Sequence, residues 1–245
     1  MKHLIFFCFL SMGFFVIGSI HGCRKENLYY PPPPPPPPPP PDTAVTTPIT
    51  SSYTEEFQDF SVMKTKGWFM IENTPIDTMG TSIWSPGLYG PTKTDTSWYG
   101  FYSYSSPYNS SEYAYSYVPA ANHSSSVSSW MFSPILVVKN GDSISFYTRG
   151  DTTGLYTNRM QVLMDTLGSV NVGHELTSVG AYTTMLFDIN PTQTSGGYPT
   201  TWKKYEYTFS GLTGSKKIRI GFRHYMIQPV NARGVGIDLF KFGMQ

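Results

Sequence analysis

Cysteine is almost absent from this 245-residue chain, which has two, Cys8 and Cys23. Both lie near the start, so the rest of the chain has no thiol that could form a disulfide. Small exported domains often depend on disulfides when their hydrophobic core is small. The residues after position 52 are numerous enough to form a single-domain core. We therefore expect that core packing stabilises the domain.

Charged residues are also scarce, at 13% of the chain, and 17 basic residues nearly balance 16 acidic ones. Proteins that bind nucleic acid carry an excess of lysine and arginine, because the phosphate backbone dominates their affinity. This chain has no such excess. The composition therefore predicts that nucleic acid is not a partner.

Catalytic motifs are missing as well. After the first 22 residues only His123, His174 and His224 remain, and their spacing suits no zinc site. The sequence has no Gly-x-Ser-x-Gly elbow and no glycine-rich phosphate loop. A glycosidase needs two carboxylates facing each other across a cleft, and no spacing nominates such a pair. We predict no catalytic residues, and hence that the protein is not an enzyme.

The first 22 residues form a pattern typical of a secretory signal peptide. A basic start at Lys2 is followed by an apolar stretch from Leu4 to Ile20, and Gly22 precedes Cys23. A cysteine at this position resembles a bacterial lipoprotein signal, in which the thiol receives the lipid. We predict lipidation of Cys23 and a lipid-anchored, surface-exposed protein on the bacterial outer membrane. The alternative is an uncleaved membrane helix, because about 17–25 apolar residues span a bilayer.

Residues 23–52 are predicted to be a linker. Pro31–Pro41 is an unbroken proline run, and proline fixes φ and lacks an N–H group, so the run adopts polyproline II. At about 3.1 Å per residue it would be a stiff spacer of about 34 Å. A ligand for proline-recognition modules is the alternative. The spacer interpretation is favoured, because those modules act mainly inside cells.

From residue 53 onward the pattern alternates with period two, and no long apolar stripe keeps helical spacing. Within Lys216–His224, for example, Ile218, Ile220 and Phe222 alternate with charged residues. Many short strands with glycine-rich connections predict an all-β fold, an antiparallel jelly-roll β-sandwich over residues 53–245. The expected strands lie at residues 53–57, 68–71, 100–104, 113–118, 129–132, 141–149, 159–164, 184–188, 203–209, 216–224 and 234–242.

Three polar residues at strand ends receive structural roles. We predict that His224 is a hydrogen-bonded structural histidine. Arg149 and Arg223 are expected to pair with carboxylates.

Aromatic residues are abundant, at 16% of the chain. They suit strands, and alternate members of Trp98–Tyr104 and Tyr113–Tyr117 are expected to fill the sandwich. Exposed rings also stack on sugars with little loss of side-chain entropy. The residues predicted to bind a ligand are Trp98, Tyr99, Tyr102 and Tyr104.

An ordered set of short motifs spans nearly the whole chain after residue 53. These motifs are Glu55-Glu56-Phe57, Gly67-Trp68, Ser129–Pro134, Gly141–Phe146, Trp202–Tyr205, Lys217–Tyr225 and Gly234–Asp238. In this order they resemble the cleaved-adhesin or choice-of-anchor J domain, related to the adhesin modules of gingipain-type proteases. The resemblance implies a noncatalytic jelly-roll sandwich on a variable anchor, some of whose relatives bind calcium or host proteins.

The resemblance also implies a calcium site at Glu55 and Asp238, which match the first glutamate and first aspartate of the family's two acidic motifs. Gln58 and Leu239 stand where the second acid of each motif would be. Calcium needs several oxygen ligands, usually including carboxylates. The alternative is that Glu55 and Asp238 cap strand ends through hydrogen bonds.

These observations favour a surface module that binds a glycan or a surface protein of the host. The alternative is a structural subunit of an envelope assembly, whose apolar patches would face a partner. A carbohydrate-active enzyme is a third and weaker alternative.

Overall fold

The structure is a computed structural model that describes residues 47–74, 84–87, 101–105, 113–118, 126–151, 153–229 and 231–245. All of these belong to one compact unit, Pro40–Gln245. The predictions for the signal peptide, Cys23, the proline run, Trp98 and Tyr99 lie outside the described residues. No helix in the described part of the chain is long and apolar enough to cross a membrane.

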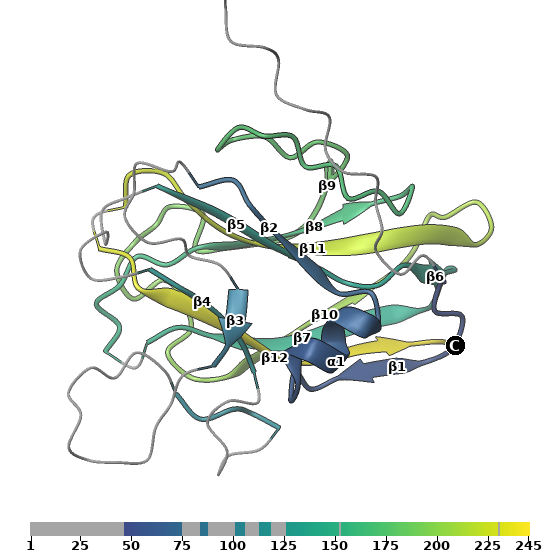
Figure 1. The fold of residues 1–245 in the computed structure, drawn as a ribbon, viewed down its shortest axis with the longest axis horizontal. Helices are drawn as coiled ribbons and strands as arrows, with labels where there is room; N and C mark the ends of the chain where they lie inside the picture. The colour runs from purple at the N-terminus through teal and green to yellow at the C-terminus, as the bar shows by residue number, and fades with distance from the viewer. Residues whose placement is uncertain are drawn as a thin grey trace, which may run out of the picture. The chain divides into compact units, whose positions relative to one another are not determined.

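Two antiparallel sheets face each other (Figure 1). The first has the strand order β10 (Lys203–Thr208), β7 (Ser143–Arg149), β12 (Gly234–Gly243), β4 (Ala114–Tyr117) and β3 (Trp84–Pro86), and β1 (Tyr53–Glu55) also pairs with β12. The second has the order β2 (Phe69–Glu72), β5 (Val127–Phe132), β11 (Lys216–Met226), β8 (Met160–Asp165) and β9 (Thr184–Ile189), and β6 (Leu136–Val138) also pairs with β11. The predicted fold class, an all-β antiparallel sandwich, is confirmed.

The main core lies between the two sheets and follows the predicted alternation. Ile144 and Phe146 of β7 point into it and are fully buried. Phe146 packs edge-on against Phe222 of the opposite sheet, with ring centroids 5.1 Å apart. Burial of apolar area at about 25 cal/mol per Å² is the main source of stability for such a core.

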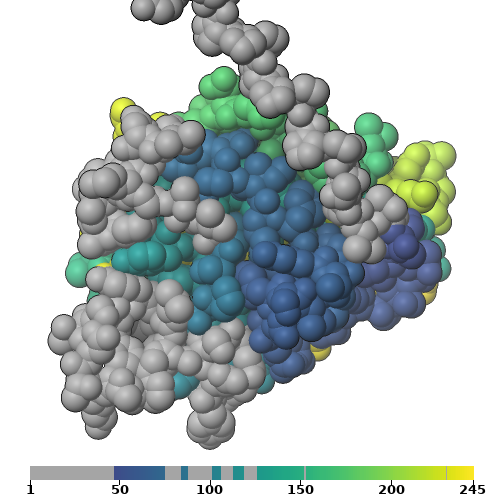
Figure 2. Space-filling model, in the orientation of Figure 1, coloured from purple at the N-terminus to yellow at the C-terminus, as the bar shows by residue number. Residues whose placement is uncertain are grey.

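The sequence analysis missed α1 (Phe60–Thr65), a short helix that lies beside β2 on the face shown in Figures 1 and 2. Asp59 caps it, because the Asp59 carboxylate accepts the backbone N–H groups of Ser61 and Val62. Met63 of α1 is fully buried in the main core. The predicted strand over residues 100–104 is wrong for its described residues, since 101–104 form no strand.

From Ile218 onward β11 is buried on both faces, although charged residues alternate along it. Arg223 donates to the Ser128 hydroxyl, the Gln161 side-chain oxygen and the Leu176 carbonyl. The predicted pairing of Arg223 with a carboxylate is therefore wrong. Residues from the connection between β8 and β9, including Val172 and Tyr182, pack on this face and cover it.

The other two polar predictions have different outcomes. Arg149 donates hydrogen bonds to the Gly150 and Thr200 carbonyls, not to a carboxylate, and Asp151 acts on it only as a nearby charge. His224 is fully buried, and its Nδ1 lies 2.8 Å from the Ser116 hydroxyl oxygen. The prediction of a hydrogen-bonded structural histidine is confirmed.

The described chain begins and ends at the same end of the sandwich. Ile49 forms a parallel bridge with Leu136, and the Met244 amide donates to the Ser52 hydroxyl. Figure 1 shows the C-terminus beside β1 and β6. We call this the entry end, because the residues before 47 join the sandwich here.

Candidate functional site

Residues Phe101–Ser105 lie across the outer face of the first sheet, and we call this segment the strap. The carboxylate of Asp238, on β12, accepts the backbone N–H groups of Tyr104 at 2.7 Å and Ser105 at 2.9 Å. It also accepts the Ser105 hydroxyl and the Leu239 amide. Asp238 therefore fixes the C-terminal half of the strap to the sheet.

A glycine on β12 makes room for the N-terminal half of the strap. A Cβ atom on Gly236 would lie 2.6 Å from the Phe101 ring, which is too close for any other residue to fit without a shift. The Arg149 guanidinium lies 4.3 Å from the centroid of the same ring, a cation–π distance. The Phe101 ring is therefore held against the sheet by its close fit over Gly236 and by the Arg149 guanidinium.

Trp202 connects the strap to the start of β10. Its indole N–H donates to the Tyr102 carbonyl at 2.9 Å. Its ring packs edge-on against Phe101 and Tyr113, with centroids 5.3 and 5.7 Å away. This half-buried tryptophan thus belongs to an aromatic cluster that also includes Tyr115.

Two tyrosine side chains of the strap are exposed to solvent. Tyr102 is 41% and Tyr104 40% exposed. The Tyr104 ring stacks on Tyr147 of β7 with centroids 3.7 Å apart, and its hydroxyl donates to the Tyr147 hydroxyl at 3.0 Å. This hydrogen bond is the main reason that the pKa of Tyr147 is raised. The pair presents a supported aromatic surface to solvent.

A depression of about 630 Å³ adjoins the strap and is lined by Gly196–Tyr205, a segment that includes Trp202. It lies away from the entry end. Ser143 at one end of β7 pairs with Gly243 at the entry end, whereas Arg149 at the other end pairs with Gly236. The two residues are six steps apart along the strand, about 20 Å at the usual rise. The candidate site comprises the strap, Tyr147, Trp202 and this depression.

The charged groups around the site include both signs. Lys204 and Glu206, both exposed on β10, form an ion pair at 2.6 Å. Lys203 also lines the depression, and its ammonium lies 5.4 Å from the centroid of the Tyr205 ring. Asp238 is fully buried beneath the strap, and burial is the main reason that its pKa is raised to about 6. Burial likewise lowers the pKa of Arg149.

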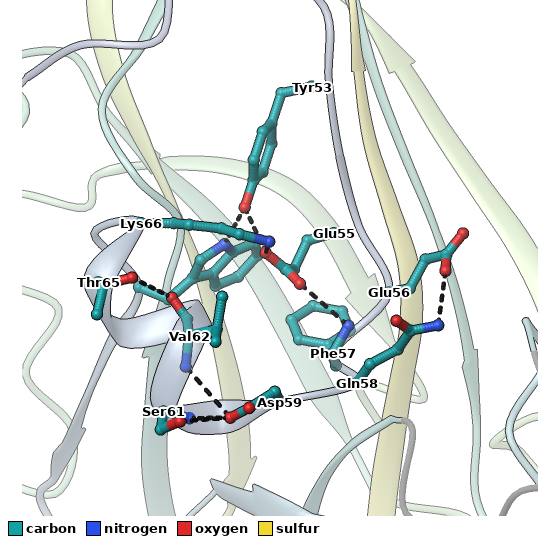
Figure 3. A network of polar contacts seen from close by, with 11 residues as sticks. Tyr53, Glu55, Glu56, Phe57, Gln58, Asp59, Ser61, Val62, Thr65 and Lys66 are labelled. Atoms are coloured by element: carbon teal, nitrogen blue, oxygen red, sulfur yellow. Dashed lines mark hydrogen bonds and ion pairs between the residues drawn. The ribbon is translucent and has the colours of Figure 1, made fainter.

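Figure 3 shows the surroundings of Glu55, the other predicted calcium ligand. Its carboxylate accepts the Tyr53 hydroxyl at 2.5 Å, the Lys66 ammonium at 3.0 Å and the Phe57 amide at 3.3 Å. The Trp68 indole N–H in turn donates to the Tyr53 hydroxyl. Glu55 thus sits in a closed network of protein donors, with Lys66 supplying the positive charge.

Both predicted calcium ligands therefore already accept hydrogen bonds from the protein, an arrangement that matches the strand-capping alternative. Among the described residues no group of three or more histidine, cysteine, aspartate or glutamate side chains is placed to hold a metal. Calcium binding at Glu55 and Asp238 stays a prediction.

Tyr102 and Tyr104, both predicted to bind a ligand, lie on the strap and are exposed, and their binding role stays a prediction. Tyr147 and Trp202 were not predicted to belong to the site. Lys204 pairs with Tyr147 and Lys203 with Thr148, so this register of β10 on β7 sets Trp202 beside Arg149. The available sequence signal was that Tyr147 and Trp202 alternate with core residues, which places both side chains on the outward-facing side of the sheet.

Comparison with known proteins gives structural similarity without sequence support: no family model and no curated protein matches the chain. A similar solved structure is the K1 cleaved adhesin domain of Lys-gingipain from Porphyromonas gingivalis W83, with 16% identity and a TM-score of 0.48 over 80% of this chain and 99% of that one. It belongs to the family that the sequence motifs resemble.

Two other similar structures are carbohydrate-binding modules with bound sugars. TmCBM61 in complex with beta-1,4-galactotriose has 11% identity and a TM-score of 0.40 over 77% of this chain and 95% of that one. The family 11 module from Clostridium thermocellum, in complex with a mixed-linked tetrasaccharide, has 12% identity and a TM-score of 0.27 over 79% and 87%.

Proposed function

We propose that this protein is a noncatalytic, lipid-anchored surface module that binds glycans through the strap and the adjoining depression. The observation that carries the proposal is the supported aromatic surface. Tyr102 and Tyr104 are exposed, Tyr147 lies under Tyr104, and Trp202 connects them to the depression. Aromatic faces pack on the C–H faces of sugars, and tyrosine hydroxyls bond to their hydroxyl groups.

Preorganisation supports the same function. Binding loses affinity when loops and side chains must become ordered. Here Asp238 holds the strap backbone, Trp202 holds the Tyr102 carbonyl and Gly236 admits Phe101. The aromatic surface is therefore fixed before a ligand arrives.

The lipid anchor on Cys23 is a separate part of the proposal, with a test of its own. If Cys23 carries the lipid, Cys23→Ser should release the protein from membrane fractions or leave an unprocessed precursor. Normal processing with full membrane retention would refute the anchor.

A polysaccharide screen tests the binding function. The detergent-solubilised full chain is compared with Tyr104→Ala, which removes the stacked ring, and with Tyr104→Phe, which keeps it. Leu167→Ala is the control, because Leu167 is 82% exposed and lies outside the site. We expect the wild type, Tyr104→Phe and Leu167→Ala to bind a common set of glycans, and Tyr104→Ala to bind about tenfold more weakly, or about 1.4 kcal/mol. Absence of glycan binding by the wild type would refute the function.

A further inference from the structure

We infer that two copies of this chain associate through strand β10, edge to edge and antiparallel, about a two-fold axis at Tyr205. The inference goes beyond glycan binding and does not depend on it. Its grounds are the position of β10 in the sheet, the direction of its backbone groups and the charges along it.

Strand β10 lies at one end of the strand order of the first sheet, and among the described residues it pairs only with β7. An edge strand presents a row of backbone groups that can pair with another chain. The side chains that flank this row are accessible. The exposed residues of β10 are Lys203, Lys204, Glu206 and Thr208.

The second sheet ends beside the same edge. Phe187 lies on β9, the last strand of that sheet, and its ring centroid is 5.5 Å from Tyr205 and 6.4 Å from Tyr207. All three aromatic residues are only half-buried. A partner strand beside β10 therefore covers apolar rings as well as backbone groups.

Hydrogen bonds at the end of β10 show which backbone groups face the edge. The Phe209 amide donates to the Asp142 carbonyl, and the Phe209 carbonyl accepts from the Gly141 amide. Phe209 thus bonds toward β7, and because backbone groups alternate in direction along a strand, so do the odd-numbered residues of β10. The even-numbered residues, which include Lys204 and Glu206, direct their backbone groups toward the edge.

Charge selects the register of the pairing. Even-numbered residues must lie opposite even-numbered ones, so an antiparallel pair can centre on Lys204, Tyr205 or Glu206. Centring on Lys204 sets two lysines opposite each other and centring on Glu206 sets two glutamates opposite each other, and like charges in these positions are destabilising. Centring on Tyr205 sets each Lys204 opposite the partner's Glu206.

The register centred on Tyr205 also keeps the ion pair that exists within one chain. Lys204 and Glu206 are 2.6 Å apart on the outer face of β10, so four charges of alternating sign would meet around the axis. The contact is isologous, because each copy contributes the same residues. The two-fold axis is perpendicular to the sheet, so both straps lie on the same outer face of one continuous sheet.

Sedimentation equilibrium of the detergent-solubilised full chain tests the inference at up to about 500 μM, since small interfaces are often weak. We expect the wild type to dimerise as concentration rises. Lys204→Glu and Glu206→Lys each set like charges opposite each other, so each should weaken dimerisation by about tenfold or more. An equimolar mixture of these two variants restores both opposite-charge pairs and should form heterodimers. The double variant, which exchanges the two charges, should dimerise like the wild type.

Lys241→Glu is the matched control, because Lys241 is also exposed but lies on β12, which pairs with β1 and β7 on its two sides. It should dimerise like the wild type, and any association through the lipid or the detergent is common to all variants. A monomeric wild type, single variants that dimerise as well as the wild type, or a mixture that stays monomeric would overturn the inference. Equal weakening by Lys241→Glu would overturn it too. None of these results bears on glycan binding, which the polysaccharide screen tests separately.

Discussion

Asp238 shows how one buried carboxylate can organise a surface. It lies at an irregularity of β12, next to Leu239, which has a φ of 47°. This local distortion accompanies the hydrogen bonds that Asp238 accepts from Leu239 and from the strap. A non-glycine residue with positive φ is strained, and such strain persists only where surrounding contacts enforce it. The hydrogen bonds that Asp238 accepts from the strap and from Leu239 hold this backbone in place.

Asp238 and His224 should affect stability in opposite directions as pH changes. The pKa of Asp238 is raised to about 6, so its contribution to stability is full below its ordinary pKa of 3.8 and is lost as pH rises through 6. Burial lowers the pKa of His224 from 6.5 to about 3, so its contribution is present above 6.5 and is lost as pH falls. The pH dependence of the wild type alone would mix the two.

Comparison with Asp238→Asn isolates the aspartate, because the His224 contribution is common to both proteins. Asparagine cannot ionise, so between pH 4.5 and 7.5 the wild type should lose about 2 kcal/mol of unfolding free energy relative to the variant. Urea denaturation at several pH values measures this difference. A difference that stays constant with pH, or changes in the opposite direction, would contradict the account of Asp238.

At the scale of elements, the strap depends on the absence of a side chain at one position of β12. Gly236→Ala should displace Phe101, because the new Cβ would lie 2.6 Å from its ring. We expect amide hydrogen exchange in residues 101–105 to become at least tenfold faster. Gly243→Ala on the same strand is a matched control, since its Cβ would meet the Ser143 hydroxyl at an ordinary 3.5 Å. Equal exchange rates in the two variants would show that the close contact does not hold the strap.

Period-two alternation predicted most strands because each strand has one face in the main core. Lys203–Thr208 and Gly234–Gly243 lie within one residue of their predicted limits. The pattern failed for Phe60–Thr65, a helix too short to display its period. It also missed two three-residue strands outside the expected ranges, Trp84–Pro86 and Leu136–Val138. It also misjudged the outer face of β11, whose cover comes from a distant connection.

The candidate site could be predicted only in part, because many of its contacts join residues that are far apart in the sequence. Aromatic density pointed to Tyr102 and Tyr104. Contacts with Tyr147, Trp202 and Asp238 depend on strand register and on the path of the strap, and these residues are 43 to 134 positions away from Tyr104 or Tyr102. Alternation could place Tyr147 and Trp202 on outward faces, but it could not show that they contact the strap.

At the scale of the whole molecule, the folded unit should not depend on calcium. A ligand that binds only the native state stabilises it by mass action, but protein donors already satisfy Glu55 and Asp238. Millimolar calcium or chelator should therefore leave the melting temperature almost unchanged. A clear rise with calcium that disappears in Asp238→Asn would contradict this expectation and support the family-derived calcium site.

The central claim is that glycans bind on the strap face, away from the entry end. Hydroxyl-radical footprinting of the full chain, with and without the glycan that binds best, tests it directly without changing any residue. We predict that the glycan lowers the oxidation of Tyr102, Tyr104 and Trp202. Oxidation of Leu167 and Met185, which are exposed outside the site, should not change. Protection of Leu167 or Met185 with unchanged oxidation of the strap tyrosines would contradict the claim.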